Sequence, residues 1–204
     1  MKSFWLIAPY AVWMALMAML PSTAAMYAVR SSATAATLLL SAWKLGVFSR
    51  CGGAPAKTLS DWRNWLWGAA GGVIVLVIWT VPENFGWYRD YFIVGDTPVA
   101  EASPYDPSVC GWTLTIAKLL GSAFVISVAE ELFFRRWLVN FAGFWWMVAL
   151  FAVEHDRYLV GAAAGVIYGF VAMRKGLTAA IIAHVLTNLL LGLYVLQTGY
   201  WRFW

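Results

Sequence analysis

Long apolar segments, separated by short polar ones, make up most of this chain. A transmembrane helix needs about 20 consecutive and mostly apolar residues, and fewer when it is short or shielded by protein. The sequence therefore predicts an all-α fold, a polytopic integral membrane bundle of about seven transmembrane helices. Their expected ranges are 4–20, 24–46, 64–82, 112–139, 143–155, 158–173 and 177–197.

The longest polar stretch, residues 83–111, separates the third expected helix from the fourth and carries five acidic residues. We expect it to be an extramembrane loop within a single membrane domain (residues 1–204), with N-terminal helices over 1–82 and a helical core over 112–197. The third helix is expected to start at "KTLSDWRNW", where Ser60 can cap it and Asp61 suits its positive end.

The first apolar run has a second reading. Lys2, the run over residues 4–20 and the small residues of "PSTAA" imitate the three regions of a secretory signal peptide. Because several apolar segments follow, we expect an uncleaved first helix.

Composition agrees with a membrane protein, since 62% of the 204 residues are hydrophobic and only 12% are charged. The formal net charge of +4 could point to a nucleic-acid partner. The basic residues, however, occur singly or in pairs between apolar segments, which is typical of topology signals. We expect a lipid bilayer around the chain and no nucleic acid.

The distribution of basic residues predicts an orientation, because positive charge collects on the cytoplasmic side. If seven helices alternate, Lys2, the basic loop over residues 44–63, the pair Arg135–Arg136 and the pair Arg174–Lys175 share one side, and the acidic loop lies on the other. We expect a multi-pass protein of the bacterial inner (plasma) membrane with a cytoplasmic N-terminus. Cys51 and Cys110 would then lie on opposite sides, where they cannot form a disulfide.

Three polar motifs interrupt the apolar core: "EELFFR" (130–135), "FAVEH" (151–155) and "HVLTN" (184–188), and together they hold both histidines of the chain. Glu131 and Arg135 are four residues apart, so they can form a local ion pair. Glu130 lies about 100° around the same helix and has no basic residue three or four positions away. The spacing therefore predicts one paired glutamate and one unpaired glutamate.

Depth along the helices brings these motifs together. If the chain turns near residues 142–143, Glu130 and His155 each lie about 18 Å from the turn, and His184 lies roughly 12 Å from the turn at Lys175. An unpaired glutamate beside a neutral imidazole can hold and deprotonate a water molecule. His184 and Asn188 share a helix face and could donate hydrogen bonds to an oxyanion. No serine or cysteine stands beside a base in a comparable position, which disfavours covalent catalysis.

Other readings of the same residues remain open. Glu130, His155 and His184 could ligate zinc, although the chain has no His-Glu-x-x-His helix, and we favour a site without a metal or other cofactor. Buried polar residues can also only hold helices together, or form a proton or ion pathway as in transporters. The glycines at 161, 165 and 169 are typical of close helix packing.

The motifs Glu-Glu-x-x-x-Arg, Phe-x-x-x-His and His-x-x-x-Asn, each on its own helix and in this order, resemble the CAAX prenyl protease and bacteriocin-processing family, the Abi or type II CAAX endopeptidase-like membrane proteases. The resemblance covers roughly residues 112–197, including "GLTAAIIAHVLTNLLLG". The N-terminal helices and the tail "QTGYWRFW" further resemble the CAAX protease-related proteins that accompany exosortase systems in Gram-negative bacteria.

The resemblance implies an intramembrane endopeptidase that cuts a membrane-associated or lipidated protein or peptide, with exosortase-system proteins as candidate partners. Rival functions are an inactive membrane scaffold or immunity-type protein of the same fold, and a proton-coupled transporter. In the family reading the roles fall on Glu130 and His155 as general base and water-activating partner, His184 and Asn188 as oxyanion hole, and Glu131 and Arg135 as a supporting ion pair.

Overall fold

The structure is a computed structural model that describes residues 2–46, 62–88 and 103–204. The described residues are 87% helical and contain no strand, which confirms the predicted all-α fold. The principal helices are α1 (Lys2–Met19), α2 (Ala24–Lys44), α4 (Trp62–Thr80), α7 (Trp112–Leu120), η3 (Gly121–Ile126), α8 (Ser127–Glu130), η4 (Glu131–Leu138), α9 (Val139–Ala142), α10 (Phe144–Val153), α11 (Tyr158–Lys175) and α12 (Leu177–Thr198). Short helical turns are η2 (Pro82–Asn84), α6 (Pro107–Cys110) and η5 (Trp201–Phe203).

The elements α7, η3, α8, η4 and α9 form one continuous helix over Trp112–Ala142. When these elements are taken as one helix, the principal helices form seven segments that lie close to the seven predicted ranges. In the described part of the chain, four helices are long and apolar enough to cross a membrane: Lys2–Met19, Trp62–Asn84, Trp112–Ala142 and Leu177–Thr198. Helix α10 is a shorter apolar helix. Helix α2 is less apolar because its buried face is polar, with Arg30, Ser31, Thr34 and Ser41.

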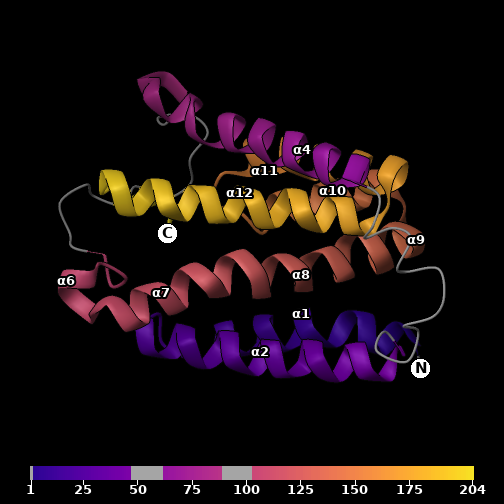
Figure 1. Cartoon of the computed structure of the whole chain (residues 1–204), viewed down its shortest axis with the longest axis horizontal. Coiled ribbons are helices and arrows are strands. Elements are labelled where there is room, and N and C mark those ends of the chain that lie inside the picture. The colour runs from indigo at the N-terminus through magenta and orange to yellow at the C-terminus, as the bar shows by residue number, and fades with distance from the viewer. Residues whose placement is uncertain (1, 47–61, 89–102) are drawn as a thin grey trace.

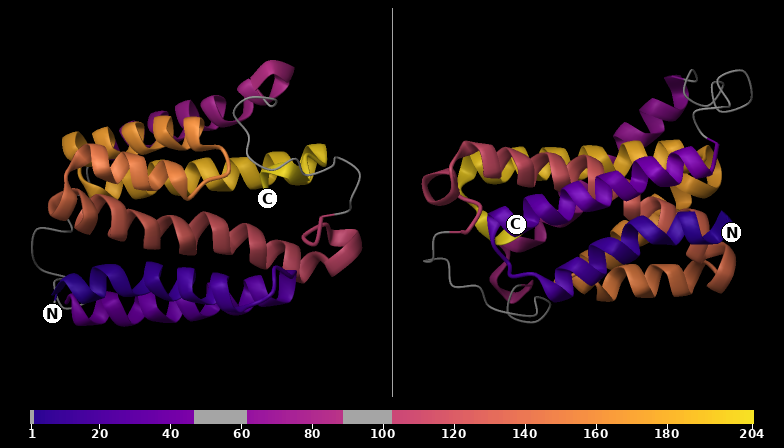
Figure 2. Two further views of the ribbon diagram at one scale, coloured as in Figure 1. Left: turned by 180° about the vertical axis from the view of Figure 1, so that it is seen from behind. Right: turned by 90° about the horizontal axis from the view of Figure 1, so that it is seen from below.

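The long helix over Trp112–Ala142 lies in the middle of the bundle (Figure 1). On one side of it lie α1 and α2, which pack against each other, and on the other side lie α4, α10, α11 and α12 (Figures 1 and 2). Helix α4 packs mainly against α12 and α11. This arrangement places the three helices that carry the polar motifs around one interior.

Turns and glycines set the register of these helices. Gly143 and Gly176 have φ angles of +92° and +88° and each begins a new helix, so the expected turn near residue 143 is confirmed. A side chain other than hydrogen is strained in that conformation. The sequence features expected at Ser60, Asp61 and Cys51 lie outside the described residues.

The glycines of α11 form the packing face predicted from their spacing. A Cβ atom on Gly161, Gly165 or Gly169 would lie 3.4 Å or less from atoms of the 144–155 segment, including Ala152, Phe151 and Phe144. Small residues let helix backbones approach each other closely in membranes. This face holds α11 against α10, and with it the segment that ends in His155.

Candidate active site

A buried ion pair lies at the centre of the three motifs, as the spacing predicted. The side chains of Glu131 and Arg135 are almost wholly buried, and the Arg135 Nη1 to Glu131 Oε1 distance is 3.1 Å. Both residues belong to η4, a π-helical stretch in which the backbone turn is widened. The Arg135 guanidinium also lies 4.0 Å from the centre of the Phe151 ring, a favourable cation–π contact.

His184 is held by Glu131 as well, a contact that the sequence did not indicate. Its Nδ1 lies 2.9 Å from Glu131 Oε1, and its ring stacks on Tyr168 at 4.7 Å between ring centres. Because a carboxylate only accepts, Nδ1 carries the hydrogen. The Nε2 atom therefore accepts a hydrogen bond when His184 is neutral and donates one when it is protonated.

Glu130 has a different environment from its neighbour Glu131. It is 7% exposed, and its Oε2 atom has no hydrogen-bond partner in the described part of the chain. An ionisable side chain close to it is His184, whose Nε2 lies 3.5 Å from Oε2. A buried carboxylate without hydrogen bonds is costly, so Glu130 is the site residue whose presence packing does not explain.

His155 faces Glu130 from the end of α10. Its Nδ1 donates to the Phe151 carbonyl oxygen at 2.7 Å, since the carbonyl cannot donate, and Nε2 is left as the basic nitrogen. The ring also makes an edge contact with Trp79, with 5.3 Å between ring centres. Ligand atoms of Glu130, Glu154 and His155 lie within 4.8 Å of one another, so the predicted approach of Glu130 and His155 is confirmed.

Asn188 lies on α12, and its side chain is partly buried. Its Nδ2 atom donates to the Ser122 carbonyl oxygen at 3.2 Å and to Ser127 Oγ at 2.9 Å. Both amide hydrogens are therefore used within the protein. Asn188 can donate to an oxyanion only when one of these hydrogen bonds breaks. The bond to Ser122 is the longer and weaker of the two, so it is the one expected to break.

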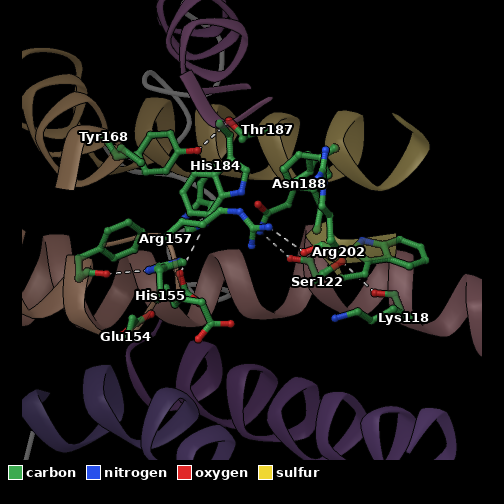
Figure 3. A pocket seen from close by; sticks show the side chains of 18 residues that line it. Lys118, Ser122, Glu154, His155, Arg157, Tyr168, His184, Thr187, Asn188 and Arg202 are labelled. Carbon is green, nitrogen blue, oxygen red and sulfur yellow. Dashed lines mark hydrogen bonds and ion pairs between the residues drawn. The ribbon is translucent and has the colours of Figure 1, made fainter. Parts of the chain in front are cut away.

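These side chains border one cavity of about 280 Å³. Figure 3 shows Glu154 and His155 on one side of it, and Ser122, Lys118 and Arg202 on the opposite side. Thus the cavity contains four of the six residues selected from the sequence: Glu130, His155, His184 and Asn188. The other two, Glu131 and Arg135, lie behind it and contact its wall.

Sequence reasoning missed Glu154, which lines the cavity, and its hydrogen-bond partner Tyr10. Glu154 lies next to His155, and its carboxylate accepts a hydrogen bond from the Tyr10 hydroxyl of α1. Glu154 could have been noticed as an acid within an apolar helical segment. Tyr10 gave no signal, because nothing in the sequence links α1 to residue 154.

The same cluster could hold a metal ion. Glu130, Glu154 and His155 offer two carboxylates and one imidazole, which suit zinc. The Nδ1 hydrogen bond of His155 to a backbone carbonyl is an arrangement common in metal-ligating histidines. His184 was expected in such a set, but it is held by Glu131 and lies outside this group of three.

Residues 112–190 match a family model, that of the type II CAAX prenyl endopeptidase Rce1-like proteins. The predicted family resemblance is therefore confirmed over the segment that carries all three motifs. The match supports a membrane protease, and it does not distinguish the exosortase-associated subfamily. No curated protein matches the chain. No solved structure matches it either.

Proposed function

We propose that this chain is an intramembrane endopeptidase that hydrolyses a peptide bond of a membrane-associated or lipidated protein, with water activated by Glu130 and His155. The observation that carries the proposal is the buried carboxylate of Glu130, whose Oε2 atom has no hydrogen bond in the described part of the chain and which lies within 4.8 Å of a ring nitrogen of His155. Intramembrane ionisable residues are retained mainly for function, and this one lies in a cavity.

In the first step, a water molecule is held between Glu130 and Nε2 of His155. Glu130 takes one proton from the water as its oxygen bonds to the peptide carbonyl carbon, and the carbonyl oxygen becomes an oxyanion. In the second step, Glu130 gives the proton to the amide nitrogen as the C–N bond breaks. The products are a new carboxyl group and a free amine.

His184 and Asn188 are the proposed oxyanion donors. His184 donates from Nε2 in its protonated form, in which the Glu131 carboxylate at Nδ1 offsets part of the cost of burying the charge. Asn188 contributes when it exchanges its bond to the Ser122 carbonyl oxygen for one to the oxyanion. Donors of this kind are typically worth about 3–4 kcal/mol each in the transition state.

Glu131 and Arg135 are positioning residues in this scheme. Glu131 fixes the His184 ring and Arg135 neutralises the Glu131 charge, while Tyr168 supports the other face of the ring. Neither member of the ion pair lines the cavity, so their effect on the reaction passes through His184.

A metal-dependent hydrolase is the second candidate, favoured by the approach of Glu154 to Glu130 and His155. A zinc ion on these three residues would lower the pKa of a bound water and polarise the peptide carbonyl. Metal analysis of the purified protein separates the two schemes. Stoichiometric zinc that disappears in His155→Ala supports the metal-dependent scheme, and full activity after chelation supports ours.

Membrane-protein C-termini are the most direct readout for the function. Proteomics would compare cells that carry the wild-type chain, Glu130→Gln and the control Asp156→Asn, which removes an exposed acid from the same cavity. We expect new C-termini with the wild type and the control, and none with Glu130→Gln. Identical C-termini in all three strains would instead favour the scaffold.

The remaining rival is a transporter, which predicts proton flux in sealed vesicles and no cleavage product. The proposed setting is the bacterial inner membrane, with the bilayer and a membrane protein substrate as partners and exosortase-system proteins as candidates. Co-purification of such a protein with Glu130→Gln, which would retain its substrate, tests that assignment.

A further inference from the structure

The cavity has a second end, opposite Glu154 and His155, where positive charge collects (Figure 3). Lys118 and Arg202 lie at this end, and Arg157, from the side of His155, reaches the Arg202 carbonyl oxygen with its guanidinium group. Much of its framework comes from outside the segment that matches the family model, including Glu83, Arg202 and Trp204. It is thus a feature of this chain beyond the three motifs.

Lys118 is held by aromatic rings and has no ion-pair partner in the described part of the chain. Its Nζ atom lies 4.1 Å from the ring centre of Tyr27, 4.7 Å from that of Tyr105 and 6.0 Å from that of Trp204. Ring faces attract a cation but leave its hydrogen-bond donors without acceptors. The ammonium group therefore retains its capacity to bind an anion.

The two arginines have one carboxylate between them. Glu83 is 1% exposed, forms an ion pair with Arg157, and has Oε2 3.2 Å from Arg202 Nε. Arg157 Nη2 also donates to the Arg202 carbonyl oxygen at 3.0 Å, which ties the C-terminal turn η5 to the start of α11. One acid cannot neutralise two guanidinium groups, so this end of the cavity carries excess positive charge with Lys118. Asp156 also lines the cavity, but its side chain is exposed.

We propose that Lys118 and Arg202 form an anion subsite that binds a carboxylate of the peptide substrate, either its chain end or an acidic side chain. This inference rests on the proposed function, because it places a peptide across the cavity. Lys118 and Glu130 are twelve residues apart on one continuous helix, or about 18 Å. An extended peptide covers that distance with about five residues. The subsite then sets how far the bound carboxylate lies from the bond that is cut.

The test measures binding, so that it does not depend on catalysis. Full-length protein in detergent is titrated with three fluorescently labelled apolar hexapeptides, and affinity is read from fluorescence anisotropy. The first has a free C-terminal carboxylate, the second is its neutral C-terminal amide, and the third is an amide with one internal glutamate. We expect a carboxylate-bearing peptide to bind about tenfold tighter than the neutral amide, in wild type and in Glu130→Gln.

Comparison of the first and third peptides identifies the source of the carboxylate. Tighter binding of the first indicates a chain end, and tighter binding of the third indicates an acidic side chain. Lys118→Met should abolish the preference and Lys118→Arg should restore it. The control is Lys175→Met, since Lys175 also lies over a ring, that of Trp67, but does not line this cavity. Equal affinity of the wild type for all three peptides would overturn the subsite without requiring any variant to fold.

The two proposals fail separately. If the wild type prefers carboxylate peptides and Glu130→Gln still cleaves its substrate, the subsite is supported and the role of Glu130 is contradicted. Loss of cleavage in Glu130→Gln without any carboxylate preference supports the protease and contradicts the subsite.

Discussion

Two adjacent glutamates occupy opposite electrostatic situations in this protein. Glu131 is wholly buried between Arg135 and His184 and has two compensating contacts at 3.1 and 2.9 Å. Glu130 faces the cavity with an oxygen that has no hydrogen bond in the described residues, beside a second acid, Glu154. The difference teaches that two neighbouring carboxylates can differ in how far the fold compensates their burial, and an uncompensated one is where the proposed function places the reaction.

The largest expected effect comes from Glu130→Gln, which is nearly isosteric and removes the base. Cleavage should fall by about 10²–10⁴-fold, as for other general bases, while the thermal stability in detergent stays the same or rises slightly. Rate and thermal unfolding are measured on one preparation. A large drop in the unfolding temperature would show that Glu130 belongs with Glu131 as a structural residue, and the comparison would break.

Glu131→Gln should act in the opposite way, because it leaves the buried charge of Arg135 without a counterion. Removing one partner of a buried ion pair typically costs about 3–5 kcal/mol. The free energy of unfolding in mixed detergent provides the measurement. The double variant Glu131→Leu with Arg135→Met should recover most of the loss, and failure to recover would mean that the stabilising contact is to His184.

Two tyrosines sharpen the contrast with a smaller effect, of about 1–3 kcal/mol each. Tyr10→Phe removes the hydroxyl that donates to Glu154 and should lower the rate of cleavage by roughly tenfold or more, with little change in stability. Tyr168→Phe removes the hydroxyl that donates to Thr187 at 2.7 Å, on the Glu131 side, and should mainly lower stability. Cleavage rate and thermal unfolding are measured for both variants. A loss of stability in Tyr10→Phe together with a loss of cleavage alone in Tyr168→Phe would contradict the division between the clusters.

Two glycines provide the least specific test, which concerns helix packing rather than either carboxylate. A Cβ on Gly72 would lie 2.6 Å from the Ala183 carbonyl oxygen, so Gly72→Ala should cost about 1–3 kcal/mol. On Gly161 the nearest atom lies at 3.4 Å, an ordinary contact, and Gly161→Ala should be nearly neutral. Equal unfolding free energies for the two variants would show that α4 and α12 can separate slightly without loss.

Hydropathy predicted the helices well, because apolar length and interrupting glycines are local properties of the chain. The turn at Gly143 and the packing of Gly161, Gly165 and Gly169 followed from the same local logic. Helix α2 formed where expected, but its buried polar face makes it less apolar than the four helices that meet the spanning criterion.

The site was only partly accessible from sequence. Helical spacing gave the pair of Glu131 and Arg135 and left Glu130 unpaired, and equal depth gave the approach of His155. Spacing could not show that His184 is held by Glu131, nor that both amide hydrogens of Asn188 are used by Ser122 and Ser127. Those contacts join different helices, whose relative rotation is set by packing of the whole bundle.

The sequence by itself determined which residues are chemically capable, since composition and helical period fix the charges that enter the apolar core and the face on which each one lies. Only the tertiary structure decided which of them are neutralised. It brought Glu154 and Tyr10 close to Glu130 and His155, and it placed Lys118 and Arg202 at the other end of the cavity. The physical reason is that a buried charge is defined by its partners in space, and those partners come from helices far apart in the chain.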